Sequence, residues 1–420
     1  MADAGDKNRF REALEEAQEG PIGRDAAYIL IRAGADQLDE LFEAAATLRT
    51  QLKGRNVSYS KKVFIPLTNL CRDYCGYCTF RKDPGDRHAH TMTPDEVLAV
   101  AEAGARLGCK EALFSLGDRP EAVFPEMRET LARLGHRSTL SYLEEMCGRV
   151  LNETGLVPHV NAGLLARKDI ETLRPISPSM GLMLESVSDR LGGPGMPHEN
   201  AVDKRPAFRI KTIDEAGRLK TPFTTGILIG IGETPDERVD SLLAIRELHE
   251  RHGHIQEVII QNFRAKPEIP MRGHPEPDLL DLKRTVAVAR LLLREMNIQA
   301  PPNLSDDGYS ELLDAGINDW GGISPLTKDF INPEKPWPHI DAVAAQTHAA
   351  GLVLKERLSV YPEYVFSDDF IDSSVAYRVR GLADRDGYAD ETAMPLALLA
   401  EAGQTELVLS NPELSKRDAI

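Results

Sequence analysis

The feature that most constrains this chain is an alternation of short β-branched segments with longer helical patterns, which begins at Lys62. Short segments such as KVFIPL, EALFSL and VPHVNAG alternate with longer helical stretches such as PDEVLAVAEAGARLG and TLSYLEEMCGRVLNETG. Such alternation is typical of βαβ units in a parallel sheet. We count eight candidate strands, the last near residues 318–320, and eight strands close a barrel. We therefore predict an α/β fold, a (β/α)8 TIM-type barrel.

Two helix starts within this alternation are well marked. Thr93 and Thr234 are each followed by Pro, Asp and Glu. A threonine cap, a proline at the first helical position and acids in the first turn all stabilise a helix N-terminus. We predict helices that begin at Pro94 and Pro235.

The segments that flank the barrel differ from it in pattern. Residues 1–57 are rich in Ala, Glu and Leu at helical spacing and predict a helical extension, and residues 58–338 form the barrel. Residues 339–366 predict C-terminal helices that pack on the barrel. Residues 367–420 are acidic and lose strand periodicity. We interpret them as an appendage or a linker.

Composition narrows the classes of function. The formal net charge of -16 argues against a nucleic-acid binder, which would concentrate positive charge, and favours a small-molecule substrate. No apolar run is long enough to cross a membrane, and the N-terminus lacks the pattern of a signal peptide. Five cysteines form no disulfide framework, and Cys109 and Cys147 have apolar neighbours typical of buried thiols. We expect a cytoplasmic protein.

Three cysteines, Cys71, Cys75 and Cys78, lie within eight residues directly after the first predicted strand. A loop wrapped around one metal centre could present all three, and three protein ligands leave an open coordination position, as catalytic metal sites do. One alternative is a zinc site completed by His88 or His90, although structural zinc sites favour paired CxxC elements. Buried thiols without a metal are the other alternative.

The motif CxxxCxxC, with Tyr77 before the last cysteine, resembles the radical S-adenosylmethionine superfamily. The resemblance implies a [4Fe-4S] cluster on Cys71, Cys75 and Cys78, with S-adenosylmethionine at the open iron. LGD at 116–118 is similar to the turn that holds the methionine amino group, and GILIGIGE at 226–233 to the strand along the adenine. The implied cofactor-binding residues are Tyr77, Gly117, Asp118, Glu185, Gly226, Leu228, Gly230 and Glu233.

Each of these cofactor motifs also has a plainer interpretation. LGD is an ordinary turn sequence, and the glycines of GILIGIGE also suit the end of any barrel strand. Glu185, which ends the segment MGLMLES, is placed near the ribose or amino group by the resemblance, and a solvated loop carboxylate is the alternative.

Longer stretches resemble one family within the superfamily. IPLTNLCRDYCGYCTFRKDPGD, FSLGDRPE, QNFRAKP and GINDWGGISPLTKDFINPEKPWP are similar to the S-adenosylmethionine half of 7,8-didemethyl-8-hydroxy-5-deazariboflavin (F0) synthases, over about residues 60–365. The resemblance implies a lyase of coenzyme F420 biosynthesis that closes the deazaflavin ring of a tyrosine-derived hydroxybenzyl adduct of 5-amino-6-(D-ribitylamino)uracil. It also implies an external electron donor and a partner radical S-adenosylmethionine half, in trans or fused, so this chain could be an N-terminal half.

Substrate-binding residues are predicted from position alone, because barrel active sites lie at the C-terminal ends of the strands. A uracil edge and a ribityl chain need many neutral donors and acceptors, although loops are polar by default and some of these residues would only face water. No general acid or base is identifiable. The candidates are Asn161, Gln261, Asn262, Arg264, Asn303, Asp306 and Trp320.

Two alternatives remain. One is another barrel enzyme of the superfamily, such as a biotin synthase, a tyrosine lyase or a menaquinone-pathway cyclase, against which the CRDYCGYCTF and GINDWGGISPLTKDFINPE contexts argue. The other is a non-catalytic iron-sulfur protein. The stretch at 226–233 argues against the second alternative, because an electron carrier needs no adenosine pocket.

Overall fold

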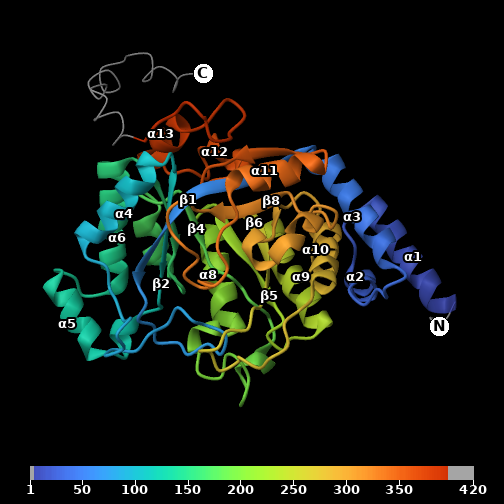
Figure 1. Ribbon diagram of the computed structural model, residues 1–420, viewed down its shortest axis with the longest axis horizontal. Coiled ribbons are helices and arrows are strands. Elements are labelled where there is room, and N and C mark those ends of the chain that lie inside the picture. Colours follow the sequence, from blue (N-terminus) through green and yellow to red (C-terminus); the bar gives the residue numbers. More distant parts are fainter. Residues whose placement is uncertain (1–3, 396–420) are drawn as a thin grey trace.

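Eight parallel strands close into a barrel surrounded by helices in the computed structural model, which describes residues 4–395 except for the side chains of 4–6, 306 and 307 (Figure 1). Each strand pairs with the next along the chain, and β1 pairs with both β2 and β8 to close the ring. The predicted (β/α)8 barrel is confirmed. Its strands are β1 Asn56–Thr68, β2 Glu111–Leu116, β3 Val157–Asn161, β4 Ser179–Gly181, β5 Phe223–Ile229, β6 Ile255–Asn262, β7 Ile298–Gln299 and β8 Asp319–Ile323.

The helices that connect the strands begin where the sequence predicts. Thr93 and Thr234 each accept a hydrogen bond from the amide three residues on, and each forms a complete capping box. The larger connecting helices are α4 Pro94–Arg106, α5 Pro125–Arg133, α6 Thr139–Arg149, α7 Arg167–Leu173, α8 Pro206–Arg218, α9 Pro235–His252 and α10 Leu279–Leu293. The short helical turns are η1 Pro120–Ala122, η2 Val150–Thr154, η3 Asp189–Gly192, η4 Val202–Lys204, η5 Pro302–Leu304 and η6 Asp306–Leu312.

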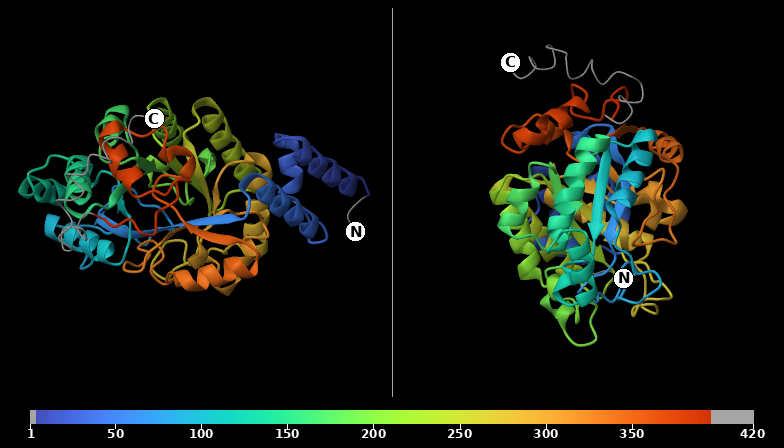
Figure 2. Two further views of the ribbon diagram at one scale, coloured as in Figure 1. Left: turned by 90° about the horizontal axis from the view of Figure 1, so that it is seen from above. Right: turned by 90° about the vertical axis from the view of Figure 1, so that its left-hand side faces the viewer.

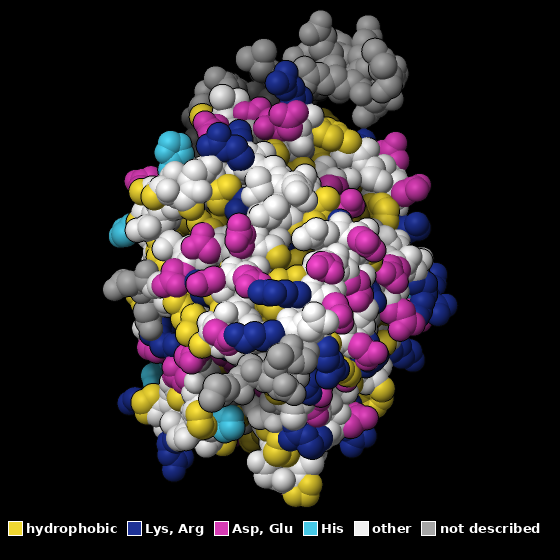
Figure 3. All heavy atoms as spheres, turned by 90° about the vertical axis from the view of Figure 1, so that its right-hand side faces the viewer, with side chains coloured by type: hydrophobic (Ala, Val, Ile, Leu, Met, Phe, Trp, Pro, Cys, Tyr) yellow, Lys and Arg dark blue, Asp and Glu magenta, His cyan; other side chains and the backbone are white. Residues whose placement is uncertain are grey.

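Three N-terminal helices lie on one side of the barrel, as Figure 1 and the left-hand view of Figure 2 show. They are α1 Ala4–Glu19, α2 Arg24–Leu30 and α3 Leu38–Lys53. Helix α3 packs against α10 and helix α2 against α9, so the extension is anchored to two barrel helices. Figure 3, viewed from this side, shows acidic side chains spread among basic ones.

The C-terminal segment departs from the prediction of helices alone. Between α11 Ile340–Ala349 and α12 Pro362–Val365 lies a ninth strand, β9 Val353–Glu356, which pairs in parallel with residues 56–59 of β1. A four-residue strand carries too little periodicity to be recognised in sequence. It forms because β1 is 13 residues long and offers an unpaired edge beyond the closed barrel.

The first part of the acidic segment 367–420 packs on the barrel. Val375 and Val379 of helix α13 Ser373–Gly381 are buried in an apolar cluster with Leu358 and Val360. This part therefore differs from a free linker, because the apolar face of α13 is buried despite its acidic surroundings. Residues 396–420 lie outside the described part of the chain.

Side chains inside the barrel follow the two-residue period of the strands. Along β2, Glu111, Leu113 and Ser115 line internal cavities, and along β6 the equivalent residues are Glu257, Ile259 and Gln261. The side chains that line the lumen are therefore ionisable at the start of these strands, apolar in the middle and polar near the C-terminal ends. Among the described helices, none has the length and apolarity that crossing a bilayer would require.

Candidate active site

Two adjoining cavities occupy the lumen and the C-terminal ends of the strands. The upper cavity, about 260 Å³, is bordered by the cysteine loop, the turn after β2 and the ends of β5 and β6. The lower cavity, about 170 Å³, lies deeper in the lumen. The two cavities share the lining residues Asn161, Leu182, Met183, Gln261, Ile331 and Asn332.

The three clustered cysteines all line the upper cavity from the loop after β1. Among the described residues, one group of three potential metal ligands has ligand atoms that all lie within 4.8 Å of one another, and it consists of Asp73, Asp118 and Asp203. The three cysteine Sγ atoms are therefore farther apart than this. A tetrahedral zinc ion with Zn–S bonds of about 2.3 Å would draw its sulfurs closer than that. The three sulfurs therefore do not form a closed zinc site.

The alternative zinc ligands point elsewhere. The imidazole of His90 pairs with Glu96 at 3.1 Å, and that of His88 accepts from Arg87 at 2.9 Å. Burial raises the pKa of the Cys71 thiol to about 12. A bound cation would be needed to hold this sulfur as the thiolate.

Gly117 permits the contact between the cysteine loop and the turn after β2. A Cβ on this residue would lie 1.9 Å from the carbonyl oxygen of Leu70 and 2.6 Å from the Cβ of Cys71. The amides of Asp73 and Asp118 both donate to Sγ of Cys71, at 3.4 and 3.2 Å. Only a glycine lets these two backbones approach so closely.

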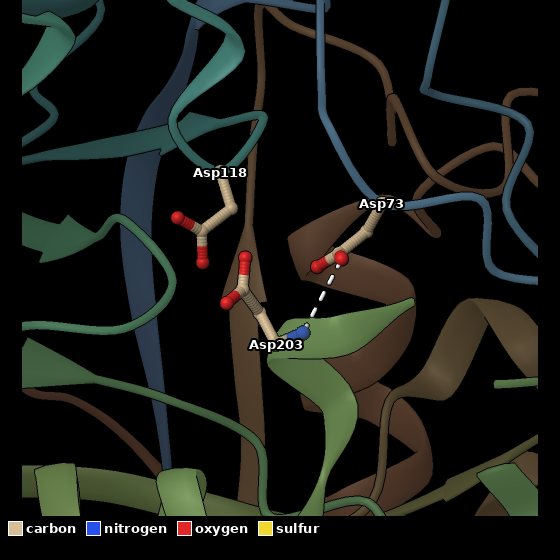
Figure 4. Close-up of side chains that lie close together, drawn as sticks. All are labelled: Asp73, Asp118 and Asp203. Atoms are coloured by element: carbon tan, nitrogen blue, oxygen red, sulfur yellow. Dashed lines mark hydrogen bonds between the residues drawn. The ribbon is translucent and has the colours of Figure 1, made fainter. Parts of the chain in front are cut away.

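Asp118 follows this glycine and belongs to a buried cluster of three carboxylates, shown in Figure 4. Its Oδ2 accepts from the amide of Leu164 at 3.0 Å, whereas its Oδ1 is buried without a hydrogen-bond partner. Burial and the nearby Asp203 raise the pKa of Asp118 to about 7. Arg72 pairs closely with Asp203, whereas the nearest cation to Asp118 is Arg119, 4.0 Å from Oδ1, which leaves this oxygen free to accept a hydrogen bond from a cationic group.

On the opposite side of the upper cavity, Tyr77 and Glu185 are fixed by buried partners. The Tyr77 hydroxyl lies 3.0 Å from Nε2 of His198. Glu185 accepts from Lys204 and lies 3.8 Å from Arg209. Burial would raise the pKa of Glu185, but these two cations outweigh it and the pKa lies below the usual value. Glu185 is therefore a carboxylate in the cavity wall, not a solvated loop residue.

The glycine-rich segment 226–233, which begins within β5 and continues past its end, divides into two parts. Leu228 lines the upper cavity, and Gly226 leaves no room for a side chain because a Cβ would lie 2.2 Å from the Ile259 carbonyl oxygen. Glu233, in contrast, accepts from the amides of Gly230 and Ile231, both at 2.8 Å, and pairs with Arg238 at 2.7 Å.

Glu233 is 2% exposed and is not among the residues that line the upper cavity. The prediction that Glu233 contacts the cofactor is therefore corrected. Its carboxylate instead accepts hydrogen bonds within the turn that contains Gly230. Gly230 itself has a φ of +86° and packs on Pro277.

The predicted substrate residues fall into two groups. Asn161, Gln261, Asn262 and Arg264 all line the upper cavity, and the first two also line the lower one. Arg264 pairs with Glu276 at 3.0 Å. These four lie together as the sequence predicts.

Two of the other candidates, Asn303 and Trp320, are not brought to the cavities. Asn303 donates to Asp329 at 3.0 Å and to the Lys335 carbonyl at 3.2 Å, and so braces the loop that contains Ile331. Trp320 is fully buried and donates to Thr347 of α11 at 3.1 Å. Its placement at the substrate was wrong, because its indole points outward from the barrel. The side chain of Asp306 lies outside the described part of the structure.

Sequence reasoning missed several residues of the upper cavity. Asp73, Lys204 and Arg209 line it, and Asp203 completes the carboxylate cluster. Asp73 lies inside the cysteine motif and could have been noticed there. The other three belong to the segment AVDKRPAFR, which carries no recognisable motif and approaches the cysteines only in the folded chain.

Comparisons with known proteins agree with this geometry. Residues 65–245 match the model of the radical SAM superfamily. The 7,8-didemethyl-8-hydroxy-5-deazariboflavin synthase of Methanopyrus kandleri is 49% identical over 333 residues, which cover 79% of this chain and 99% of that protein. The FO synthase of Streptomyces avermitilis is also 49% identical, over 90% of this chain but 45% of its own length.

Solved structures support the fold. The hydrogenase maturase HydG aligns with a TM-score of 0.71 at 16% identity over 98% of this chain and 92% of that one. Methylornithine synthase aligns with a TM-score of 0.65 at 18% identity, over 81% of this chain and 97% of that one. At these identities the likeness shows the fold alone.

The lengths of these matches decide whether the chain corresponds to a whole relative or to part of one. This chain spans about half the length of the FO synthases that it matches, 45% and 46% for the two Streptomyces proteins. It matches the Methanopyrus protein almost from end to end. The chain therefore belongs to the 7,8-didemethyl-8-hydroxy-5-deazariboflavin synthase family of the radical S-adenosylmethionine superfamily.

Proposed function

We propose that this chain is the radical S-adenosylmethionine half of an F0 synthase, a lyase that closes the deazaflavin ring in coenzyme F420 biosynthesis. Its substrate would be the hydroxybenzyl adduct of 5-amino-6-(D-ribitylamino)uracil. The observation that carries the proposal is the arrangement of three cysteine sulfurs around one cavity that also contains the Asp118 carboxylate, whose Oδ1 has no hydrogen-bond partner. This cavity adjoins a second one in the lumen.

The residues of the upper cavity fit a [4Fe-4S] cluster with S-adenosylmethionine. Cys71, Cys75 and Cys78 supply three ligands, and three ligands leave one iron open. When bound, this pair of groups supplies a 5'-deoxyadenosyl radical that removes a hydrogen atom from the substrate. Asp118 would accept hydrogen bonds from the methionine ammonium group, and Leu228 would pack against the adenine.

Other side chains of this chain orient the reactants and exclude water. Tyr77 packs with Phe263 and Ile269 in an apolar cluster beside Cys75 and Cys78, which keeps that side of the site dry. Asn161 and Gln261 line both cavities and would hold the substrate at the boundary between them. Positioning of this kind is the main contribution a protein makes to radical chemistry.

The proposal includes two partners besides the substrate. A second radical S-adenosylmethionine half would form the adduct, which agrees with the greater length of the related FO synthases. An external donor would supply the electron for each cleavage of S-adenosylmethionine. A thiolate-bound cluster also suits a reducing compartment, and we place the protein in the cytoplasm.

The test is reconstitution with iron and sulfide without oxygen, followed by dithionite and S-adenosylmethionine. Wild type should release 5'-deoxyadenosine, and Cys75→Ala should not. Cys109→Ala is the matched control, because Cys109 is fully buried and does not line the upper cavity. With the second half, tyrosine and the uracil added, wild type should produce fluorescent F0. A fully loaded four-iron protein that leaves S-adenosylmethionine intact would refute the proposal.

A further inference from the structure

The floor of the lower cavity lies far from the cysteines. Glu111, Thr224 and Glu257 are the first, second and third residues of β2, β5 and β6, and all three line it. Glu257 and Gln261 are four residues apart on β6, which is about 13 Å along a strand. Ser359, from the chain after β9, completes the floor. A ligand that reaches from the mouth to this floor must be elongated.

An apolar band separates the floor from the mouth. Phe64, Leu113, Met183 and Ile259 line this level of the lumen. The ring of Phe64 stacks on that of Trp337, with centroids 5.2 Å apart and planes 8° apart, which holds it rigidly. A flat ring system is the kind of group that such a band accommodates.

The charged groups of the floor are already paired with one another. Nζ of Lys62 lies 2.6 Å from Oε1 of Glu111. Arg357 contacts Asp319 at 2.7 Å and Glu257 at 3.3 Å. Lys62 and Arg357 are the only lysine and arginine among the described residues that line the lower cavity, so it offers no unpaired cation to an anionic ligand.

Two further groups of the floor are uncharged hydrogen-bonding partners. Burial lowers the pKa of His159 to about 3, so its imidazole is neutral, and Nδ1 bonds to Ser179 at 2.7 Å. Nε2 is left for a ligand. Oγ of Ser359 is buried without any hydrogen-bond partner, which is uncommon and costly unless a ligand satisfies it.

We infer that this floor binds the polyhydroxy chain of the substrate in its unphosphorylated form. The inference rests on the proposed function and extends it to the substrate's orientation: the chain points to Thr224, Glu257 and Ser359, the ring lies in the apolar band, and the reacting end faces the cysteines. A phosphorylated chain is rejected, because its charge would meet carboxylates whose cations are already paired.

The experiment measures binding of three probes to the reconstituted full chain by fluorescence. The probes are F0, its analogue with a methyl group in place of the ribityl chain, and F0 phosphorylated at the end of that chain. We expect F0 to bind at least about tenfold more tightly than either of the others, since several hydrogen bonds of modest strength add up.

Matched variants on β5 locate the effect. Thr224→Val removes a hydroxyl that bonds to Glu257 at 3.3 Å on the floor. It should weaken F0 about threefold to tenfold and leave the methyl analogue unchanged. Ser359→Ala should do the same and serves if Thr224→Val does not fold. Thr225→Val is the control, because its hydroxyl is buried and unpartnered but does not line the cavity.

The outcomes separate the inference from the proposed function. Equal binding of F0 and the methyl analogue would overturn the floor assignment and leave a deazaflavin site in place. Binding of the phosphorylated probe as tight as that of F0 would overturn the selection for an unphosphorylated chain. Failure of all three probes to bind would count against the proposed function itself, and the inference would fall with it.

Discussion

The backbone amide of Asp118 donates a hydrogen bond to Sγ of Cys71 at 3.2 Å, which ties the turn after β2 to the cysteine loop after β1. The same turn places the Asp118 carboxylate in the upper cavity. One short segment therefore fixes both a sulfur and the group that we assign to the methionine ammonium. Hydrogen bonds to the sulfurs are also one of the factors that set the potential of a cluster.

Gly117→Ala should disrupt this junction. The added methyl group would lie 1.9 Å from the Leu70 carbonyl oxygen, and the backbone must shift to relieve it. We expect a loss of about 1–3 kcal/mol in the free energy of unfolding and a clear drop in iron bound per chain. Gly148→Ala, on helix α6 with open space around it, should keep its iron and gain up to about 1 kcal/mol. Full iron loading in Gly117→Ala would contradict this view of the turn.

Trp320→Phe and Gln261→Ala should have opposite effects. Trp320 donates to Thr347 outside the lumen, so its replacement should lower the melting temperature and leave 5'-deoxyadenosine release by the folded protein unchanged. Gln261 lines both cavities, so Gln261→Ala should raise the KM for the adduct several-fold with little change in melting temperature. Thermal unfolding and steady-state kinetics check the pair. A selective rise in KM for Trp320→Phe would return that residue to the site.

Stability should fall in mild acid, in part through His254. Burial lowers the pKa of His254 to about 3 in the folded state, and its Nε2 lies 2.9 Å from the Ile213 carbonyl oxygen. Between pH 6.5 and 3 the unfolded chain binds a proton here that the folded chain does not, so stability is lost as the pH falls.

The expected contribution of His254 is about 1 kcal/mol per pH unit below 6.5. His254→Gln should flatten the dependence of the unfolding free energy on pH between 6.5 and 5, whereas His348→Gln, at an exposed position on α11, should not. Denaturant titrations at several pH values measure the slopes. Equal slopes in wild type and His254→Gln would remove His254 as a cause.

Arg357→Met should be severely destabilising. Its loss would leave Asp319 and Glu257 buried without their cation, a change that typically costs about 3–5 kcal/mol. Arg380→Met, which breaks a surface pair with the 89%-exposed Asp368, should cost at most about 1 kcal/mol. Urea unfolding compares the two. Similar costs would mean that the floor tolerates unpaired carboxylates.

Much of the fold could be predicted from sequence because its signals are local. The alternation of strand and helix patterns predicted the barrel, and the cap sequences at Thr93 and Thr234 predicted where two helices begin. β9 could not be predicted, since four residues form a strand only against the free edge of β1. The packing of α13 likewise depends on a surface that the local sequence does not contain.

The candidate site was predictable where motif and geometry coincide. Cys71 and Asp118 lie at the ends of neighbouring strands, so a strand order was enough to bring them together. Trp320 was misplaced because side chains alternate across a strand: Asp319 reaches Arg357 in the lumen, so Trp320 must point outward. Asp203 reaches Asp73 across 130 residues of chain, and no local pattern could reveal that contact.

The chain that leaves β9 supplies Arg357 and Ser359 to the lower cavity. It then enters the apolar cluster that contains Val375 and Val379 of α13. A polypeptide cut after β8 would keep all eight barrel strands and every cysteine. It would lack Arg357 and Ser359, which form part of the floor of the lower cavity. The smallest unit that retains the whole site must therefore extend beyond the barrel itself, at least through α12. Anyone who divides a longer relative into working halves should place the cut downstream of that helix.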